Sequence, residues 1–189
     1  MNAMARSLLG QIEATQVGEP WYGSSRARLL AGLTAEQAAA HPISGARSIW
    51  ELVLHMVAWT REVTRRIQGQ PAAEPIEGDW PAVPAVTPQA WAAVQTELAA
   101  AHRALLAAVA AMPDERWQQV VGESREPGLG TGVDVAGMLV GLAQHDAYHT
   151  GQVVVVRRAL DGARPPEPGP DRASCARVGG EAGKANTAT

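Results

Sequence analysis

The sequence predicts an all-α protein, built as a four-helix bundle with long crossover loops. Apolar residues recur every three or four positions in the long segments, which is helical spacing, and no segment is typical of a β-strand. Two of the predicted helices each present a broad apolar face, and a four-helix bundle is the simplest way to bury both. The long helices are expected at residues 4–17, 48–68, 87–112 and 133–160, and short ones at 24–33, 35–40 and 113–117.

The clearest of these helices is the one over 48–68. Its apolar stripe consists of Ile49, Leu52, Val53, Met56, Val57, Val63 and Ile67. Gly69 follows it, as a glycine commonly follows the end of a helix. A capping box formed by Thr34 and Gln37 marks the start of the short helix over 35–40.

Proline and glycine define the connections between the helices. Residues 70–88 contain five prolines, so we expect a long loop there, and residues 122–132 form a second, glycine-rich loop. Residues 163–189 are rich in proline, glycine and small polar residues and are expected to form a disordered tail. The folded domain is therefore predicted to span residues 1–162.

The composition argues against several classes of protein. The net charge is −3, the pI is about 5.9 and no basic stripe is present, so we expect no nucleic acid partner. No segment approaches the roughly 20 apolar residues that a membrane span requires, and no signal peptide is evident. The one cysteine, Cys175, cannot form an internal disulfide, which fits a reducing compartment. We expect a cytoplasmic protein.

Two histidines interrupt the apolar face of the last predicted helix. That face consists of Val135, Met138, Leu142, His145, His149, Gln152 and Val156. Because the face is apolar at both ends, it should point into the bundle, with His145 and His149 one turn apart in its middle. This spacing lets two imidazoles reach one metal ion. The alternative is a pair of core histidines bonded to the backbone, Tyr148 or Gln152.

Two histidines alone hold an ion poorly, so a third ligand is required, and His55 is the best candidate. It lies in the middle of the helix over 48–68, where a buried imidazole is costly without a partner. Taken alone, it is more often a hydrogen-bonded core residue. Glu51, one turn earlier, either orients the free ring nitrogen of His55 or faces solvent. His41, in a loop, and His102, among alanines, are weaker candidates.

Two stretches of the chain resemble the DinB/YfiT-like superfamily. The segment SIWELVLHMVAW, from Ser48 to Trp59, is similar to the second helix of that family. The segment AQHDAYHTGQ, from Ala143 to Gln152, is similar to its fourth helix. The resemblance extends over most of residues 5–162, and the combination of both segments is specific.

The resemblance implies an up-down-down-up arrangement of the four helices, often in a homodimer. It also implies a divalent metal, zinc or nickel in many members, held at the positions of His55, His145 and His149. All three histidines are present. It is the resemblance that fixes His55 as the third ligand.

Relatives in the superfamily include transferases that use low-molecular-weight thiols, such as bacillithiol or mycothiol, and a maleylpyruvate isomerase. The resemblance therefore implies a metal-dependent thiol S-transferase acting on small electrophiles, because a metal-bound thiol is deprotonated and nucleophilic. The loops over 70–88 and 122–132 are the candidates for the thiol pocket.

Two alternatives remain open at this point. The first is a metal-dependent hydrolase, for which Glu51 and Asp146 are the candidate general bases. The second is a stress-associated metal-binding protein without turnover. Cys175 is a poor candidate nucleophile, because no histidine lies near it in the sequence.

Overall fold

The computed structural model describes residues 3–121 and 132–162, and over these ranges the protein is all-α. The long helices are α1 (Ala3–Val17), α4 (Ile49–Ile67), α5 (Pro88–Ala110) and α6 (Val135–Leu160). The short ones are α2 (Arg26–Leu30), α3 (Ala35–Ala39) and the 3-10 helix η1 (Asp114–Gln118). The described residues contain no strand, and their only β-type pairing is an isolated bridge between Val120 and Asp134.

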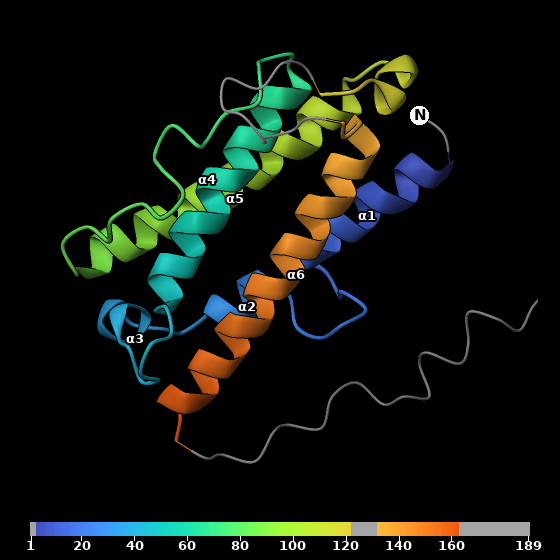
Figure 1. The fold of residues 1–189 in the computed structure, drawn as a ribbon. Coiled ribbons are helices and arrows are strands. Elements are labelled where there is room, and N and C mark those ends of the chain that lie inside the picture. Colours follow the sequence, from blue (N-terminus) through green and yellow to red (C-terminus); the bar gives the residue numbers. More distant parts are fainter. Residues whose placement is uncertain (1–2, 122–131, 163–189) are drawn as a thin grey trace, which may run out of the picture.

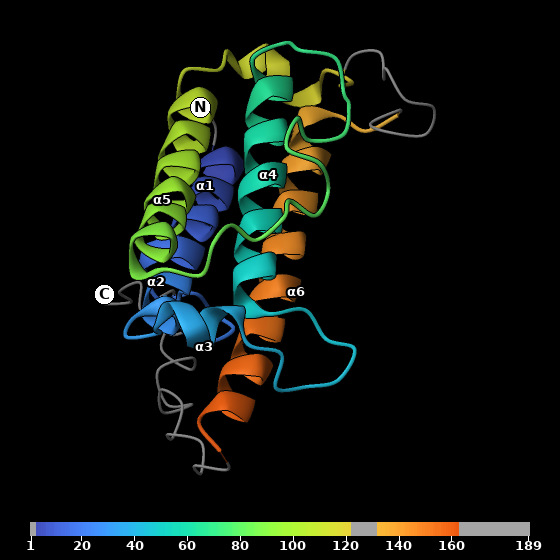
Figure 2. The same cartoon turned by 90° about the vertical axis from the view of Figure 1, so that its left-hand side faces the viewer.

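The four long helices pack against one another around a shared core. α4 contacts both α5 and α6, and α1 contacts both α6 and α5 (Figures 1 and 2). The short helices α2 and α3 lie at one end of this assembly, where the connection between α1 and α4 passes (Figure 2). No helix in the described ranges combines the length and the apolarity needed to cross a membrane.

All seven predicted helices are present, with ends within a few residues of those expected. The main difference is the helix expected over 24–33, which spans only Arg26–Leu30. Its end has a local cause, since Ala31 has extended backbone and Gly32 has a φ of 76°, which favours glycine. Most of the glycine-rich loop and the expected tail over 163–189 lie outside the described residues, so the domain boundary at 162 stays a prediction.

Side-chain caps fix where the helices begin. The predicted capping box of Thr34 and Gln37 is confirmed at α3. A second capping box starts α4, where the Ser48 hydroxyl accepts from the backbone N–H of Glu51, and the Glu51 carboxylate accepts from the backbone N–H of Ser48. The carboxylate of Asp134 caps α6 in the same way by accepting from the N–H of Gly137.

The hydrophobic core has two parts, and a polar layer lies between them. On α6, Leu142 belongs to one part and Val153 to the other, and both histidines of the helix lie between these residues. On α5 the same division falls between Ala101 and Leu105, on either side of His102. Buried polar groups therefore lie between the two parts of the hydrophobic core, where they need specific hydrogen-bond partners.

The expected proline-rich loop is confirmed, because residues 70–86 form no regular element. It is nevertheless fastened to α4. The buried carboxylate of Glu62 accepts from the N–H of Ala73 at 3.0 Å, and Arg66 donates to the carbonyl of Ala73 at 2.7 Å. Further along, Arg61 pairs with Glu77 at 2.8 Å. These contacts hold the loop against the surface of α4 as it runs towards His55.

Candidate metal centre

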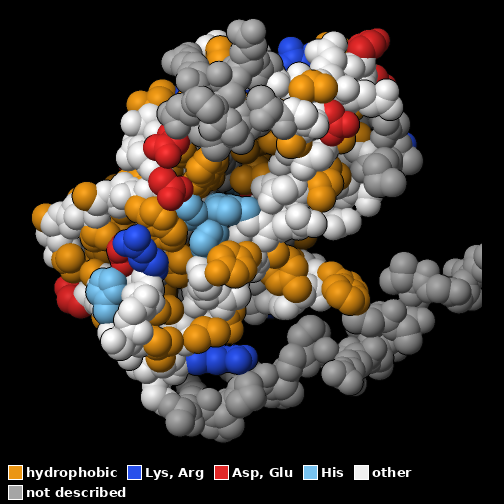
Figure 3. All heavy atoms as spheres, viewed as in Figure 1, with side chains coloured by type: hydrophobic (Ala, Val, Ile, Leu, Met, Phe, Trp, Pro, Cys, Tyr) orange, Lys and Arg blue, Asp and Glu red, His pale blue; other side chains and the backbone are white. Residues whose placement is uncertain are grey.

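Three imidazoles from two helices converge between α4 and α6. His55 comes from α4, and His145 and His149 come from successive turns of α6. Their ring centroids are 4.4, 4.6 and 4.9 Å apart, and one nitrogen of each ring lies within 4.8 Å of the other two. Figure 3 shows a group of histidine side chains accessible at the centre of this face, with hydrophobic side chains around them.

Two of the three rings are oriented by oxygen acceptors on the side away from the cluster. Nδ1 of His55 lies 2.6 Å from the carbonyl oxygen of Asp79, and Nδ1 of His149 lies 2.7 Å from the amide oxygen of Gln152. Because these oxygens only accept, each Nδ1 carries the proton. The Nε2 atoms of His55 and His149 are therefore free to donate lone pairs, which is the tautomer that a metal ligand needs.

Burial favours the neutral form of both of these imidazoles. Desolvation is the main cause that lowers the pKa of His55, with a further lowering by His145 against the opposing effect of the Asp79 carbonyl. Burial likewise lowers the pKa of His149, against the hydrogen bond to Gln152. Neutral rings bind metal, whereas protonated ones cannot.

The arrangement of nitrogens fits a divalent ion. Nε2 of His55 lies only 2.9 Å from Nε2 of His145, so the two ring nitrogens face the same point. Two nitrogens bound to one zinc ion at 2.0–2.1 Å lie at most about 4 Å apart. A metal ion satisfies this contact and the third imidazole together, so the cluster is able to bind one.

Aromatic side chains surround the cluster. The indole of Trp80 stacks on His55, the ring of Trp59 lies edge-on to His55 and His145, and Tyr148 packs edge-on against His149. Trp59 also donates its N–H to the side chain of Asp79 at 2.7 Å, which holds the loop residue that orients His55. One side stays accessible, because the side chain of His145 is 29% exposed.

The interpretation of Glu51 as the partner of His55 is wrong. Its carboxylate caps α4 and pairs with Arg47 at 2.7 Å, and it is Asp79 that contacts the free ring nitrogen of His55. Asp79 was not predicted, because the sequence of an irregular loop does not show where that loop contacts a helix. The capping signal at Ser48 and Glu51 was readable from their spacing.

Asp146 is engaged in a buried ion pair behind the cluster. It is fully buried and forms an ion pair with Arg26 at 2.5 Å, so it is not accessible as a general base. Burial alone would raise the pKa of Asp146, but Arg26 and His145 hold that pKa below its ordinary value. The carboxylate is therefore ionised.

The two remaining described histidines do not join the cluster. His41 is exposed, near the carbonyl of Ala46 and the carboxylate of Glu51. His102 is buried 3.4 Å from Arg26, and burial together with this charge lowers the pKa of His102 to about 4. Cys175 lies outside the described residues.

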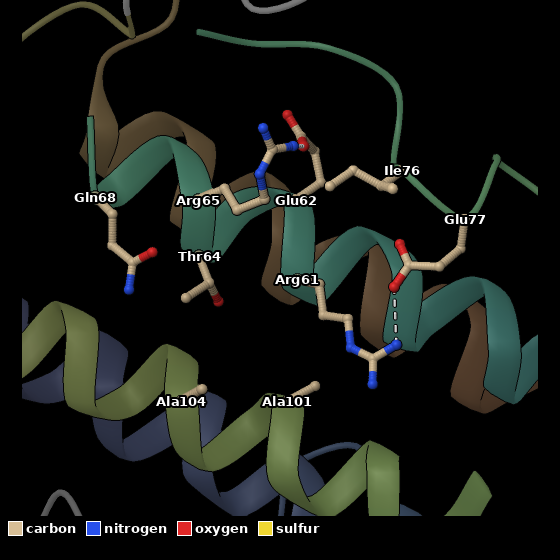
Figure 4. Close-up of a pocket in the computed structure, with 9 residues that line it drawn as sticks. All are labelled: Arg61, Glu62, Thr64, Arg65, Gln68, Ile76, Glu77, Ala101 and Ala104. Atoms are coloured by element: carbon tan, nitrogen blue, oxygen red, sulfur yellow. Dashed lines mark hydrogen bonds and ion pairs between the residues drawn. The ribbon is translucent and has the colours of Figure 1, made fainter. Parts of the chain in front are cut away.

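A cavity of about 350 Å³ lies elsewhere, between α4 and α5. Its floor is formed by Ala101 and Ala104, whose small side chains leave the space open, and Arg61 and Thr64 face them from α4 (Figure 4). At 100° per residue, these α4 positions lie on a different face of the helix from His55. The loop over 70–88 thus covers two separate places, the cavity and the cluster.

The helical fold and the three convergent imidazoles place this protein among all-α proteins with a histidine cluster suited to one metal ion. Residues 25–153, more than half of the chain and including all three histidines, match the family model of the DinB superfamily. The chain belongs to this superfamily, which confirms the resemblance noted in the sequence. No curated protein and no solved structure matches the chain.

Proposed function

We propose that this protein binds one divalent metal ion at His55, His145 and His149, and that the site serves a thiol S-transferase acting on small electrophiles. The observation that carries the proposal is the convergence of three imidazoles, two of them fixed with their protons pointing outward. Three imidazole nitrogen ligands suit zinc and nickel alike. A small-molecule electrophile and a low-molecular-weight thiol are the proposed ligands.

We also propose that the four long helices form the up-down-down-up bundle typical of the superfamily, in a homodimer. In support, α4 and α5 rise in Figure 2 while α1 and α6 descend, and each helix packs on two others. In this arrangement α4 and α6 lie side by side and contribute all three ligands.

The chemistry follows from a three-ligand site with an open position. When bound, the ion would lower the pKa of a coordinated thiol so that the thiolate is present at neutral pH. His145 lies on the accessible side, and the rings of Trp59, Trp80 and Tyr148 contact the imidazoles around it. The transfer would form a sulfur–carbon bond on the electrophile and break the bond from that carbon to its leaving group. With an aryl halide, the halide would depart with the bonding electron pair and the thiol proton would pass to solvent.

Hydrolysis is less well supported by the geometry. It requires a general base near the ion, and both candidate carboxylates are engaged elsewhere, Glu51 in a helix cap and Asp146 in a buried ion pair. A metal-binding role without turnover is a separate outcome that experiment distinguishes.

The test has two stages. Purified protein is first analysed for zinc and nickel, and then incubated with bacillithiol or mycothiol and a chromogenic aryl halide, with and without a chelator. Thiol consumption that depends on metal and disappears in His145→Ala supports the transferase. Metal-dependent ester or amide hydrolysis without thiol favours the hydrolase, and bound metal with neither activity favours a non-enzymatic role.

A further inference from the structure

A buried ion pair lies directly behind the metal centre. Arg26 and Asp146 are each 2% exposed, and Nη1 of Arg26 lies 2.5 Å from Oδ2 of Asp146. Arg26 is itself held by α1, because its Nε donates to Gln16 at 2.9 Å and its Nη2 donates to Thr15 at 3.2 Å. The guanidinium is thus fixed by one helix and aimed at a carboxylate of another.

The other oxygen of this carboxylate faces a metal ligand. Oδ1 of Asp146 and Nδ1 of His145 are both buried, have no hydrogen-bond partner among the described residues, and lie 3.7 Å apart. An unsatisfied buried polar atom is costly, and a small rotation of the imidazole joins these two atoms in one hydrogen bond.

We propose that Asp146 is a positioning residue for His145, and that Arg26 determines which carboxylate oxygen is available to it. This inference rests on the proposed metal-binding function. An ionised carboxylate only accepts, so it places the proton of His145 on Nδ1 and leaves Nε2 free for the ion. Through Arg26, α1 and α2 take part in a site to which they contribute no ligand.

The opposite tautomer of His145 would block the site. Its proton would then lie on Nε2, which points at Nε2 of His55 only 2.9 Å away. A hydrogen bond between two ligands would occupy the place of the metal. The orientation of the proton on His145 therefore decides whether the three rings present three lone pairs.

This argument makes an unusual prediction for Asp146→Asn. Arg26 has only donors, so the amide must turn its oxygen to Arg26 and its NH2 group to His145. Nδ1 of His145 then has to accept, and the proton moves to Nε2. We expect the imidazole nitrogen NMR shifts of the metal-free variant to show that the His145 proton has moved from Nδ1 to Nε2. Zinc affinity should fall about 10–100-fold, the range seen when a metal-binding histidine loses its hydrogen-bond partner.

Two double variants separate positioning from simple packing. In Arg26→Met with Asp146→Asn, the amide is free to offer its oxygen to His145, so the Nδ1–H tautomer and most of the zinc affinity should return. In Arg26→Met with Asp146→Leu, no acceptor remains, and affinity should stay low. Neither double variant leaves a lone buried charge, so both should fold even if the single variant does not.

Glu62→Gln is the matched control, since Glu62 is a buried carboxylate paired with Arg66 at 2.7 Å and does not contact the cluster. Its amide oxygen can still accept from the N–H of Ala73, so the loop stays attached to α4. The substitution should destabilise the protein without changing zinc affinity. Equal zinc affinity in the two double variants, or an unchanged tautomer in Asp146→Asn, overturns the inference and leaves the proposed function intact. A wild-type protein that binds neither zinc nor nickel overturns the proposed function. In that case the NMR comparison of the His145 tautomer in the wild type and in Asp146→Asn still tests whether Asp146 orients this ring.

Discussion

The indole of Trp80 lies flat on the imidazole of His55, with ring centroids 3.9 Å apart and planes 8° apart. The guanidinium of Arg47 also lies over the indole, 4.3 Å from its centroid. Both groups cannot occupy one face of the ring, so Trp80 is enclosed between a cation and one of the three clustered imidazoles. A loop residue thereby fixes the plane of a histidine ring on α4.

Trp80→Ala should loosen His55 without removing any ligand. We expect zinc affinity to fall several-fold, because the ring loses the surface that holds its plane and the neighbouring carbonyl of Asp79 becomes less fixed. Competition with a chelating dye measures this. Trp21→Ala is the control, since Trp21 is 91% exposed; equal effects from the two substitutions would argue against a specific role for the stack.

Gln152→Leu should weaken the site through His149. The substitution removes the oxygen that accepts from Nδ1 of His149 at 2.7 Å, and loss of such a partner typically costs about 10–100-fold in metal affinity. Gln152→Glu keeps an acceptor and should bind zinc at least as tightly as the wild type. The exposed Gln144, substituted by Leu, controls for the surface change. If Gln152→Leu binds zinc normally, the hydrogen bond has no part in orienting the ligand.

Glu51→Ala tests the corrected role of this carboxylate. Because Glu51 completes the capping box at Ser48, its loss should lower the free energy of unfolding by about 1 kcal/mol, measured by urea denaturation. Zinc affinity should not change. A large fall in affinity with little loss of stability would restore Glu51 as a partner of His55.

The stability of the metal-free protein should fall as the pH is lowered from 6.5. His102 has an ordinary pKa of 6.5 when unfolded and a pKa of about 4 when folded. Between these values the unfolded chain binds the extra proton, so folding is disfavoured as the pH falls. The slope reaches about 1.4 kcal/mol per pH unit only below pH 6.5, so this residue contributes roughly 1–2 kcal/mol between pH 6.5 and 5.

His102→Gln is the variant that checks this assignment. Its amide oxygen can accept from Arg26 as Nδ1 of His102 does, but it does not titrate. Urea unfolding with chelator present should show a shallower dependence on pH for the variant. An unchanged dependence would mean that His102 is not among the groups responsible.

The sequence predicted the helices and the histidine pair because both depend on local spacing. His145 and His149 lie one turn apart on the same helical face whatever surrounds them. The position of His55 beside them depends on how α4 packs on α6, which spacing does not determine. Its place in the middle of a helix made it a candidate, and the family resemblance was the main reason to choose it. The role of Asp79 could not be predicted from the sequence for the same reason, because its contact with His55 depends on the path of an irregular loop.

Buried polar partners were also hard to anticipate. Arg26 lies in a short helix whose sequence suggests a surface cation, yet it is enclosed in the core beside Asp146. Its burial results from tertiary packing of α2 against α1 and α6. By contrast, Gln152 was named from the sequence as a hydrogen-bond partner of the histidine pair, within the alternative to a metal site, because it lies on the same helical face three residues after His149.

The most direct test of the account is a zinc titration of the metal-free protein, comparing the wild type with His55→Ala and with His41→Ala as the control for loss of a histidine. We predict one zinc ion per chain in the wild type and in His41→Ala. We predict for His55→Ala a loss of affinity greater than the about 100-fold that removal of an outer partner produces. Zinc binding of equal strength in all three proteins, or no binding in the wild type, would contradict the three-histidine site.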